Sequence, residues 1–167
     1  MEAARLLDAR YHLVITNVPY LARGKQTDAL KKYCEHHYAE AKSDLANVFL
    51  ERCMALALPP SPADRCGEEV GRGVVQIVMP QNWLFLNGYR KQRESLLQRF
   101  QWPLLARLGF AAFDIMDWWA FGTILLTLTN LKPALDTKLL GIDVSPPRSV
   151  DEKAELLKTI KFSSVTQ

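Results

Sequence analysis

Two continuous apolar segments, separated by a helix-length segment and a loop, constrain the fold of this 167-residue chain more than any other feature. Residues 13–15 read Leu-Val-Ile and end at a turn, and residues 74–80 read Val-Val-Gln-Ile-Val-Met-Pro. Short apolar runs of this kind are typical of strands covered on both faces, as in parallel sheets. A strand, a helix and a second strand in this order predict a right-handed parallel crossover.

The crossover helix is the clearest helical pattern in the chain. Ser43 is a good N-cap, and Asp44 falls in the first turn, where the helix dipole favours a negative charge. One buried stripe then recurs at helical spacing: Leu45, Val48, Phe49, Cys53 and Leu56. Further helices are predicted at residues 28–37, 90–99 and 150–158.

The later apolar runs LLARLGF and AFGTILLTLTN have no helix-length segment between them, which predicts an antiparallel hairpin. The whole pattern predicts an α/β fold. We expect a partial doubly wound, Rossmann-like sheet that is mainly parallel, with the antiparallel hairpin at one edge. Ligands of such sheets bind at the carboxyl ends of the parallel strands, and residues 17–20 occupy the first of these ends.

The composition excludes several classes of protein. With 49% hydrophobic and 23% charged residues the chain resembles a soluble globular protein and not a disordered one. The net charge of +3 permits contact with phosphates but does not by itself indicate nucleic-acid binding. The chain opens with no basic-then-apolar leader, and its apolar runs are too short to cross a bilayer, so we expect a cytoplasmic protein without membrane contact.

Neither the cysteines nor the histidines predict a metal site. Cys34, Cys53 and Cys66 are odd in number and form no CxxC pair, so we expect reduced, structural thiols. His36 and His37 are adjacent and therefore point about 100 degrees apart on a helix, which prevents them from binding one metal ion from the same face.

The residues that end the first strand, Asn17, Val18, Pro19 and Tyr20, suit one kind of chemistry. The lone pair of an amino group on an aromatic ring or amide is delocalised, so that nitrogen is a poor nucleophile. The Asn17 side-chain oxygen and the Val18 carbonyl can each accept one of its hydrogens and free the lone pair. Pro19 fixes the turn, and Tyr20 offers a flat face for stacking. An Asn-x-Pro-Tyr turn also occurs after strands without any catalytic role.

Four segments in order extend this pattern: ITNVPYLARGKQ, KSDLANVFLERCMAL, VMPQNWLFLNGYRKQRESLL and LARLGFAAF. They resemble adenine-specific DNA methyltransferases of the large phage-defence type found in BREX systems, the PglX-like and Eco57I-like enzymes. The resemblance runs from about residue 11 to residue 130. It implies methyl transfer from S-adenosylmethionine to the amino group of a flipped-out adenine in double-stranded DNA, without a metal.

The resemblance also implies roles for individual residues. The family usually has Asn-Pro-Pro-Tyr at the strand end, so Asn17, Pro19 and Tyr20 match, while Val18 replaces the first proline and contributes only its carbonyl. Asp44 and Leu45 match the family's helix beside the cofactor pocket. A cluster of aromatic residues, which lies where the family places a ring against the target base, consists of Trp118, Trp119 and Phe121.

Other candidates have an ordinary explanation beside the functional one. The basic residues after the turn are expected either to neutralise DNA phosphates or to form a solvated surface: Arg23, Lys25, Lys31 and Lys32. Three aromatic residues are expected to pack in the core and loops: Trp83, Phe85 and Tyr89. Three basic residues of the following helix are expected to face solvent: Arg90, Lys91 and Arg93.

One family feature is absent from the sequence. The strand, glycine-rich turn and acidic residue that bind S-adenosylmethionine have no counterpart before Tyr11. We therefore expect residues 1–131 to be the C-terminal half of a catalytic domain and residues 132–167 to connect toward a missing region. The isolated chain is then expected to be inactive, and three origins stay open: a fragment, a truncated gene, or one piece of a split protein whose upstream half is a separate chain.

Two alternatives stay open on the sequence. An RNA or glutamine-amide methyltransferase faces the same amino-group problem and would use nearly the same turn. A non-catalytic remnant that binds nucleic acid or a partner chain would account for the absent glycine turn.

Overall fold

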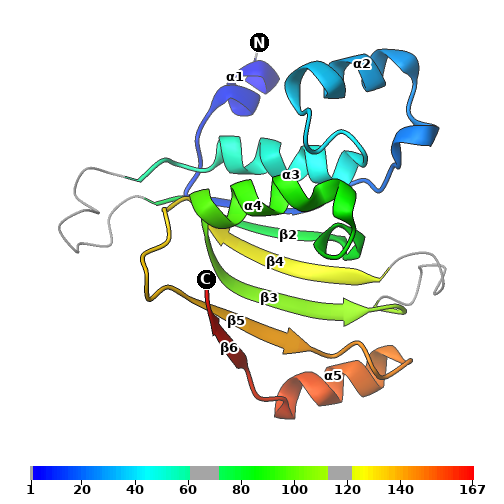
Figure 1. The fold of residues 1–167 in the computed structure, drawn as a ribbon, viewed down its shortest axis with the longest axis vertical. Coiled ribbons are helices and arrows are strands. Elements are labelled where there is room, and N and C mark those ends of the chain that lie inside the picture. Colours follow the sequence, from blue (N-terminus) through cyan, green and yellow to red (C-terminus); the bar gives the residue numbers. More distant parts are fainter. Residues whose placement is uncertain (1, 61–71, 113–121) are drawn as a thin grey trace.

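The computed structural model describes residues 2–60, 72–112 and 122–167. These residues contain a six-stranded sheet with strand order β1-β2-β4-β3-β5-β6 (Figure 1). Its strands are β1 (Leu13–Asn17), β2 (Val74–Pro80), β3 (Gln101–Gly109), β4 (Thr123–Thr129), β5 (Lys138–Asp143) and β6 (Ser163–Thr166). The α-helices are α1 (Glu2–Asp8), α2 (Asp28–His37), α3 (Leu45–Leu56), α4 (Arg90–Arg99) and α5 (Val150–Thr159).

The predicted crossover is confirmed. β1 and β2 pair in parallel from Leu13 opposite Val74 to Asn17 opposite Val78, and α3 lies between them in the sequence. The start of α3 differs from the prediction by one residue. Asp44, and not Ser43, is the N-cap, because its extended backbone lets its side chain accept a hydrogen bond from the Ala46 N–H at 2.9 Å.

The antiparallel hairpin of β3 and β4 is also confirmed, but its predicted place at the sheet edge is wrong. β4 pairs antiparallel with β2, and β5 pairs in parallel with the other side of β3. β6 then pairs antiparallel with β5. Residues 132–167 therefore add two strands and α5 to the same sheet, and the hairpin lies inside it.

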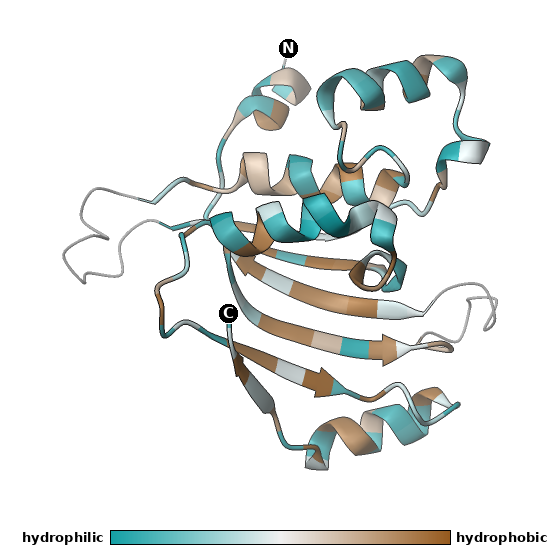
Figure 2. Ribbon diagram, viewed as in Figure 1, coloured by the Kyte–Doolittle hydropathy of each residue, from teal (hydrophilic) through white to brown (hydrophobic). Residues whose placement is uncertain are grey.

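One face of the sheet forms the core. Alternate residues of β2 and β4 on this face are fully buried and pair across the strands, as Ile77 does with Leu126. α3 and α4 cover this face at the β1–β2 side of the sheet (Figure 1). Hydrophobic residues accordingly concentrate along the central strands, whereas α2 is mostly hydrophilic (Figure 2).

The opposite face of the sheet is less covered. Val78 and Leu125 on this face are half-buried, and on the edge strand β1 Leu13 and Ile15 are 56% and 69% exposed. Since successive side chains of a strand point to opposite faces, these exposed residues lie on the face away from α3. No helix in the described part of the chain is long and apolar enough to cross a membrane.

Candidate functional site at the carboxyl edge of the sheet

Four strands end at the same edge of the sheet, because β1, β2, β3 and β5 run in one direction. We call this edge, on the right in Figure 1, the carboxyl edge. The Asn17–Tyr20 turn, Gln81, Gly109 and Asp143 lie there at or just beyond the strand ends. This is the position at which open α/β sheets bind their ligands.

The Asn17–Tyr20 turn alternates between exposed and buried side chains. Asn17 is exposed, whereas Val18 is only 4% exposed. The Val18 N–H donates to the Val78 carbonyl at 3.4 Å, which extends the β1–β2 pairing by one residue. Pro19 is exposed, and Tyr20 is half-buried against the core. The turn therefore holds the Asn17 carboxamide in solvent on a backbone fixed by its neighbour.

Asp44 lies within electrostatic reach of two tyrosines at this edge. Burial raises the pKa of Tyr20, a hydrogen bond with Thr123 opposes the shift, and the Asp44 charge adds to it. Burial and the same charge raise the pKa of Tyr89. The Asp44 carboxylate thus lies close enough to both phenols to disfavour their ionisation.

Backbone hydrogen bonds connect the start of α3 to the chain after the turn. The Leu45 N–H donates to the Leu21 carbonyl at 3.0 Å, and the Arg23 N–H donates to the Ser43 carbonyl at 3.0 Å. Leu45 packs against a small cluster beside α2. The structure therefore brings the Asn17–Tyr20 turn and the Asp44–Leu45 pair together.

The four basic candidates differ in their partners. Arg23 forms an ion pair with Glu35 at 2.6 Å, and Lys31 forms one with Asp28 at 3.2 Å. Lys25 and Lys32 are exposed, and no carboxylate of the described residues lies within ion-pair distance of either.

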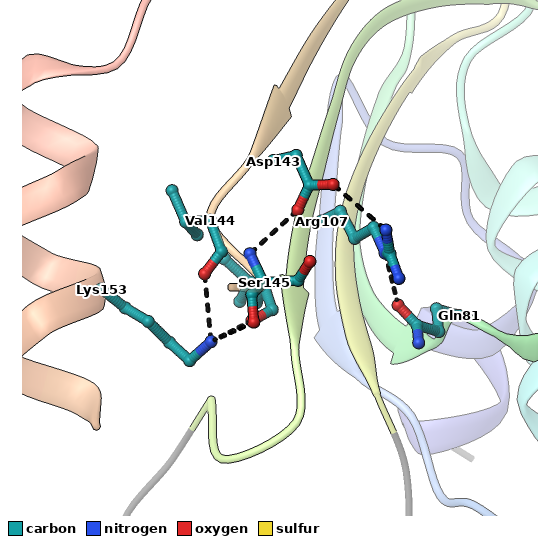
Figure 3. A network of polar contacts seen from close by, with 7 residues as sticks. Gln81, Arg107, Asp143, Val144, Ser145 and Lys153 are labelled. Atoms are coloured by element: carbon teal, nitrogen blue, oxygen red, sulfur yellow. Dashed lines mark hydrogen bonds and ion pairs between the residues drawn. The ribbon is translucent and has the colours of Figure 1, made fainter. Parts of the chain in front are cut away.

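A polar network joins the ends of β2, β3 and β5 (Figure 3). Arg107 donates from Nε to Gln81 Oε1 at 3.0 Å and from Nη1 to Asp143 Oδ2 at 3.1 Å. Although desolvation opposes it, hydrogen bonds from Ser145 and the charge of Arg107 lower the pKa of Asp143. Lys153 of α5 is 4% exposed and donates to the carbonyls of Leu108, Val144 and Ser145 at 2.8, 3.0 and 3.3 Å. The network fixes α5 and the three strand ends as one unit.

The loop after β2 departs from the sequence predictions in two places. Trp83 is buried and Tyr89 half-buried as expected, but Phe85 is 62% exposed. Arg93 does not simply face solvent, because its Nη1 donates to the carbonyls of Trp83 and Leu86. Arg90 and Lys91 are exposed as predicted.

Trp118, Trp119, Phe121 and Cys66 lie outside the described residues. His36 and His37 are exposed, and Cys34 and Cys53 are free and buried. Within residues 2–60, 72–112 and 122–167 no group of three or more His, Cys, Asp or Glu side chains is arranged to hold a metal ion.

A sequence profile of the Eco57I restriction-modification methylase family matches residues 5–110. This chain belongs to that family. The match contains the Asn17–Tyr20 turn, the Asp44–Leu45 pair and the Phe85 loop. The resemblance noted in the sequence is thereby confirmed.

Curated relatives of this Eco57I-family chain carry related names. It is 28% identical over 116 residues to the adenine-specific methyltransferase PglX of Lacticaseibacillus casei (strain Zhang). It is 27% identical over 113 residues to the adenine-specific methyltransferase BrxX of Escherichia coli O9:H4 (strain HS). Each alignment covers 68% of this chain and 8% of the relative, so the chain spans a small part of these proteins.

Solved structures with low sequence identity share the fold of this family member. A nuclease-deletion mutant of the Type ISP restriction-modification enzyme LlaGI, in complex with a DNA substrate mimic, has a TM-score of 0.67 at 12% identity, covering 98% of this chain and 18% of that one. A modification subunit of a putative type I restriction enzyme from Vibrio vulnificus YJ016 has a TM-score of 0.63 at 18% identity, covering 94% and 34%. A putative class I S-adenosylmethionine-dependent methyltransferase from Listeria monocytogenes has a TM-score of 0.56 at 14% identity, covering 90% and 42%. The predicted methyltransferase-type α/β fold is thus confirmed.

Proposed function

We propose that this chain carries the target-amine site of an S-adenosylmethionine-dependent methyltransferase that methylates the exocyclic amino group of adenine in double-stranded DNA. The observation that carries the proposal is the exposed Asn17 carboxamide at the carboxyl end of β1, in an Asn-Val-Pro-Tyr turn within the segment that matches the family. The names of the PglX and BrxX relatives support adenine as the acceptor.

Each residue of the turn has a distinct part in the proposed reaction. The Asn17 side-chain oxygen and the Val18 carbonyl accept the two amino hydrogens, which localises the nitrogen lone pair for attack. Pro19 restricts the backbone so that the Val18 carbonyl is directed away from the strand ladder. Tyr20 stacks on the extruded adenine ring. The nitrogen loses a proton to solvent once it carries the methyl group.

S-adenosylmethionine, when bound, supplies an electrophilic methyl group on a positively charged sulfonium. The Asp44 carboxylate suits such a donor, because it carries the opposite charge and lies within electrostatic range of Tyr20 and Tyr89. Asp44 and Leu45 are therefore the residues of this chain that we assign to the cofactor side of the site. Asp44 would attract the sulfonium while it also caps α3.

Positive side chains near the turn are assigned to the DNA backbone. Lys25 and Lys32 are the stronger candidates because they are exposed and their charges are not balanced by a described carboxylate. Arg23 and Lys31 would first exchange Glu35 and Asp28 for phosphates. Neutralising phosphates on either side of the target would favour extrusion of the base.

A further polypeptide segment is proposed to complete the cofactor site. β1 is the edge strand of the described sheet, and its Leu13 and Ile15 are largely exposed. Pairing a parallel strand with β1 would satisfy the outer backbone groups of β1, and the helix of its crossover connection would cover these side chains. We assign to that segment the glycine-rich turn that the family resemblance implies.

Replacement of Asn17 tests the proposal. Methyl transfer from labelled S-adenosylmethionine to an adenine-containing duplex is measured with the chain and the proposed further segment together. Asn17→Ala is expected to lower the rate at least about a hundredfold, the scale for losing one pre-positioned hydrogen-bonding group. Asn17→Asp keeps an acceptor oxygen and should retain measurable transfer.

The control is His12→Ala, which removes an exposed polar side chain just before the amino end of the same strand and should transfer normally. Unchanged thermal unfolding of Asn17→Ala separates lost chemistry from lost folding. Normal turnover by Asn17→Ala would refute the assignment. Transfer to RNA or to a glutamine peptide, but not to the duplex, would refute DNA as the acceptor.

A further inference from the structure

Phe85 is an exposed ring between two residues that anchor its loop. Trp83 is 1% exposed and Leu84 packs against the core, whereas Phe85 and Leu86 are 62% and 54% exposed. Single exposed apolar residues are common on protein surfaces and need no explanation by themselves. Three further observations set Phe85 apart.

The backbone around Phe85 is fixed. The Phe85 and Leu86 N–H groups donate to the Asn82 carbonyl at 3.0 and 3.1 Å. Arg93 of α4 then donates to the carbonyls of Trp83 and Leu86, one on each side of Phe85. A ligand that contacts this ring therefore does not have to order the loop, which removes part of the entropic cost of binding.

The ring itself is held by a guanidinium. The Cζ atom of Arg107 lies 5.7 Å from the centroid of the Phe85 ring. Arg107 is in turn fixed by Gln81 and Asp143 (Figure 3). Because Asp143 balances the charge of Arg107, the ligand that suits this place is a flat, weakly polar ring and not a free phosphate.

The loop that carries the ring starts at the same carboxyl edge as the proposed amine site. This loop begins at the end of β2, the neighbour of β1, where Val78 is opposite Asn17. The loop ends at Tyr89, and the charge of Asp44 contributes to the raised pKa of Tyr89 as it does to that of Tyr20. The Gln81 N–H also donates to the Gly122 carbonyl at 2.7 Å, directly before Thr123, the partner of Tyr20.

We propose that Phe85 is a stacking surface for a nucleobase next to the target base, with Arg93 and Arg107 as positioning residues. The inference rests on the proposed function in so far as the methyl acceptor is a nucleic acid. Stacking on a phenyl ring is available to any base, so Phe85 adds affinity for unpaired bases without reading sequence.

The test separates contact with bases from contact with phosphates. Binding of the chain is measured by fluorescence anisotropy with a labelled single DNA strand of about ten nucleotides and with an abasic strand of the same length. Phe85→Ala is expected to weaken binding to the base-containing strand about fivefold to a hundredfold, and to leave binding to the abasic strand unchanged.

Three further variants make the test specific. Phe85→Trp keeps a flat face and should bind like the wild type. Phe162→Ala removes a ring of similar exposure, 58%, from the residue before β6 at the far edge of the sheet, and should have no effect. Arg107→Gln should weaken binding only when Phe85 is present, so its effect should vanish in the double variant with Phe85→Ala.

Three results would overturn the inference: equal binding by Phe85→Ala and the wild type, equal weakening of both strands, or no preference of the wild type for the base-containing strand. The outcome is independent of the Asn17 experiment. Normal methyl transfer by Asn17→Ala together with base-dependent loss in Phe85→Ala would remove the proposed chemistry and keep the stacking surface.

Discussion

At the scale of single residues, Gly73 shows how closely the crossover packs. A Cβ atom at Gly73 would lie 2.3 Å from the Leu58 nitrogen and 2.8 Å from the Ala57 carbonyl carbon. These atoms belong to the backbone after α3, and Gly73 donates to Leu58 O at 3.0 Å, so they cannot move aside without breaking the contact. The glycine therefore serves the packing of β2 against the end of α3.

We expect Gly73→Ala to lower the free energy of unfolding by about 1 to 3 kcal/mol, the usual effect of forcing extra volume into a packed site. Gly88→Ala is the matched control, because nothing lies within 4 Å of its added Cβ. That variant should stay within about 1 kcal/mol of the wild type. Urea unfolding measures both changes, and equal stability of the two variants would contradict the packing argument.

The sequence predicts where a residue lies in an element when the signal is local. Asn17 and Pro19 lie at and just after the end of β1, as the strand and turn patterns predict, and Asp44 takes the capping position one residue after the predicted cap Ser43. Phe85 and Arg93 were not predicted correctly, because their surroundings depend on where α4 lies against the loop. Sequence patterns predict that Arg93, in the first turns of α4, faces solvent. The folded chain places the carbonyls of Trp83 and Leu86 within hydrogen-bonding distance of its guanidinium.

At the scale of elements, a buried polar cluster joins α3 to α4. Asn47 donates to Gln92 Oε1 at 2.8 Å, and Gln92 donates to Glu51 Oε1 at 3.1 Å. Burial raises the pKa of Glu51 and Glu40 adds to the shift, while Gln92 and Arg99 oppose it. The folded chain thus binds the Glu51 proton more tightly than the unfolded chain, so the stability contributed by this group falls as the pH rises from the unfolded pKa through the folded pKa.

Glu51→Gln keeps the acceptor for Gln92 and removes the charge. We expect it to raise the free energy of unfolding at pH 7 by less than about 1 kcal/mol, since solvent screens part of the effect. The gain should disappear below about pH 4, where an unfolded glutamate is also protonated. Urea unfolding at both pH values measures it, with Glu94→Gln on the exposed side of α4 as the control. A loss of stability at pH 7 would show that the charged carboxylate supports the junction.

β5 and β6 are the strands that the sequence patterns do not predict. β1, β2 and the β3–β4 hairpin have continuous apolar runs and are predicted from them. β6 reads Ser-Ser-Val-Thr and is exposed along its whole length, so it has no apolar pattern, and β5 contains a glycine and charged ends. These strands form because β3 offers an open edge next to them, which is a long-range condition that periodicity does not contain.

At the scale of the whole molecule, we expect the β1 edge and the adjoining sheet face to govern association. Leu13 and Ile15 lie on an edge strand, and exposed apolar edges pair with other chains. We expect the chain alone to self-associate, and the double variant Leu13→Thr and Ile15→Thr to become more monomeric without losing its fold. Leu135→Thr is the control, since that leucine is 99% exposed and lies in the loop before β5 and not on the β1 edge. Sedimentation velocity over a range of concentrations measures the association. If Leu135→Thr becomes as monomeric as the double variant, or if the wild type is already monomeric, the β1 edge does not drive association. The proposed strand partner of β1 would then lose its physical support.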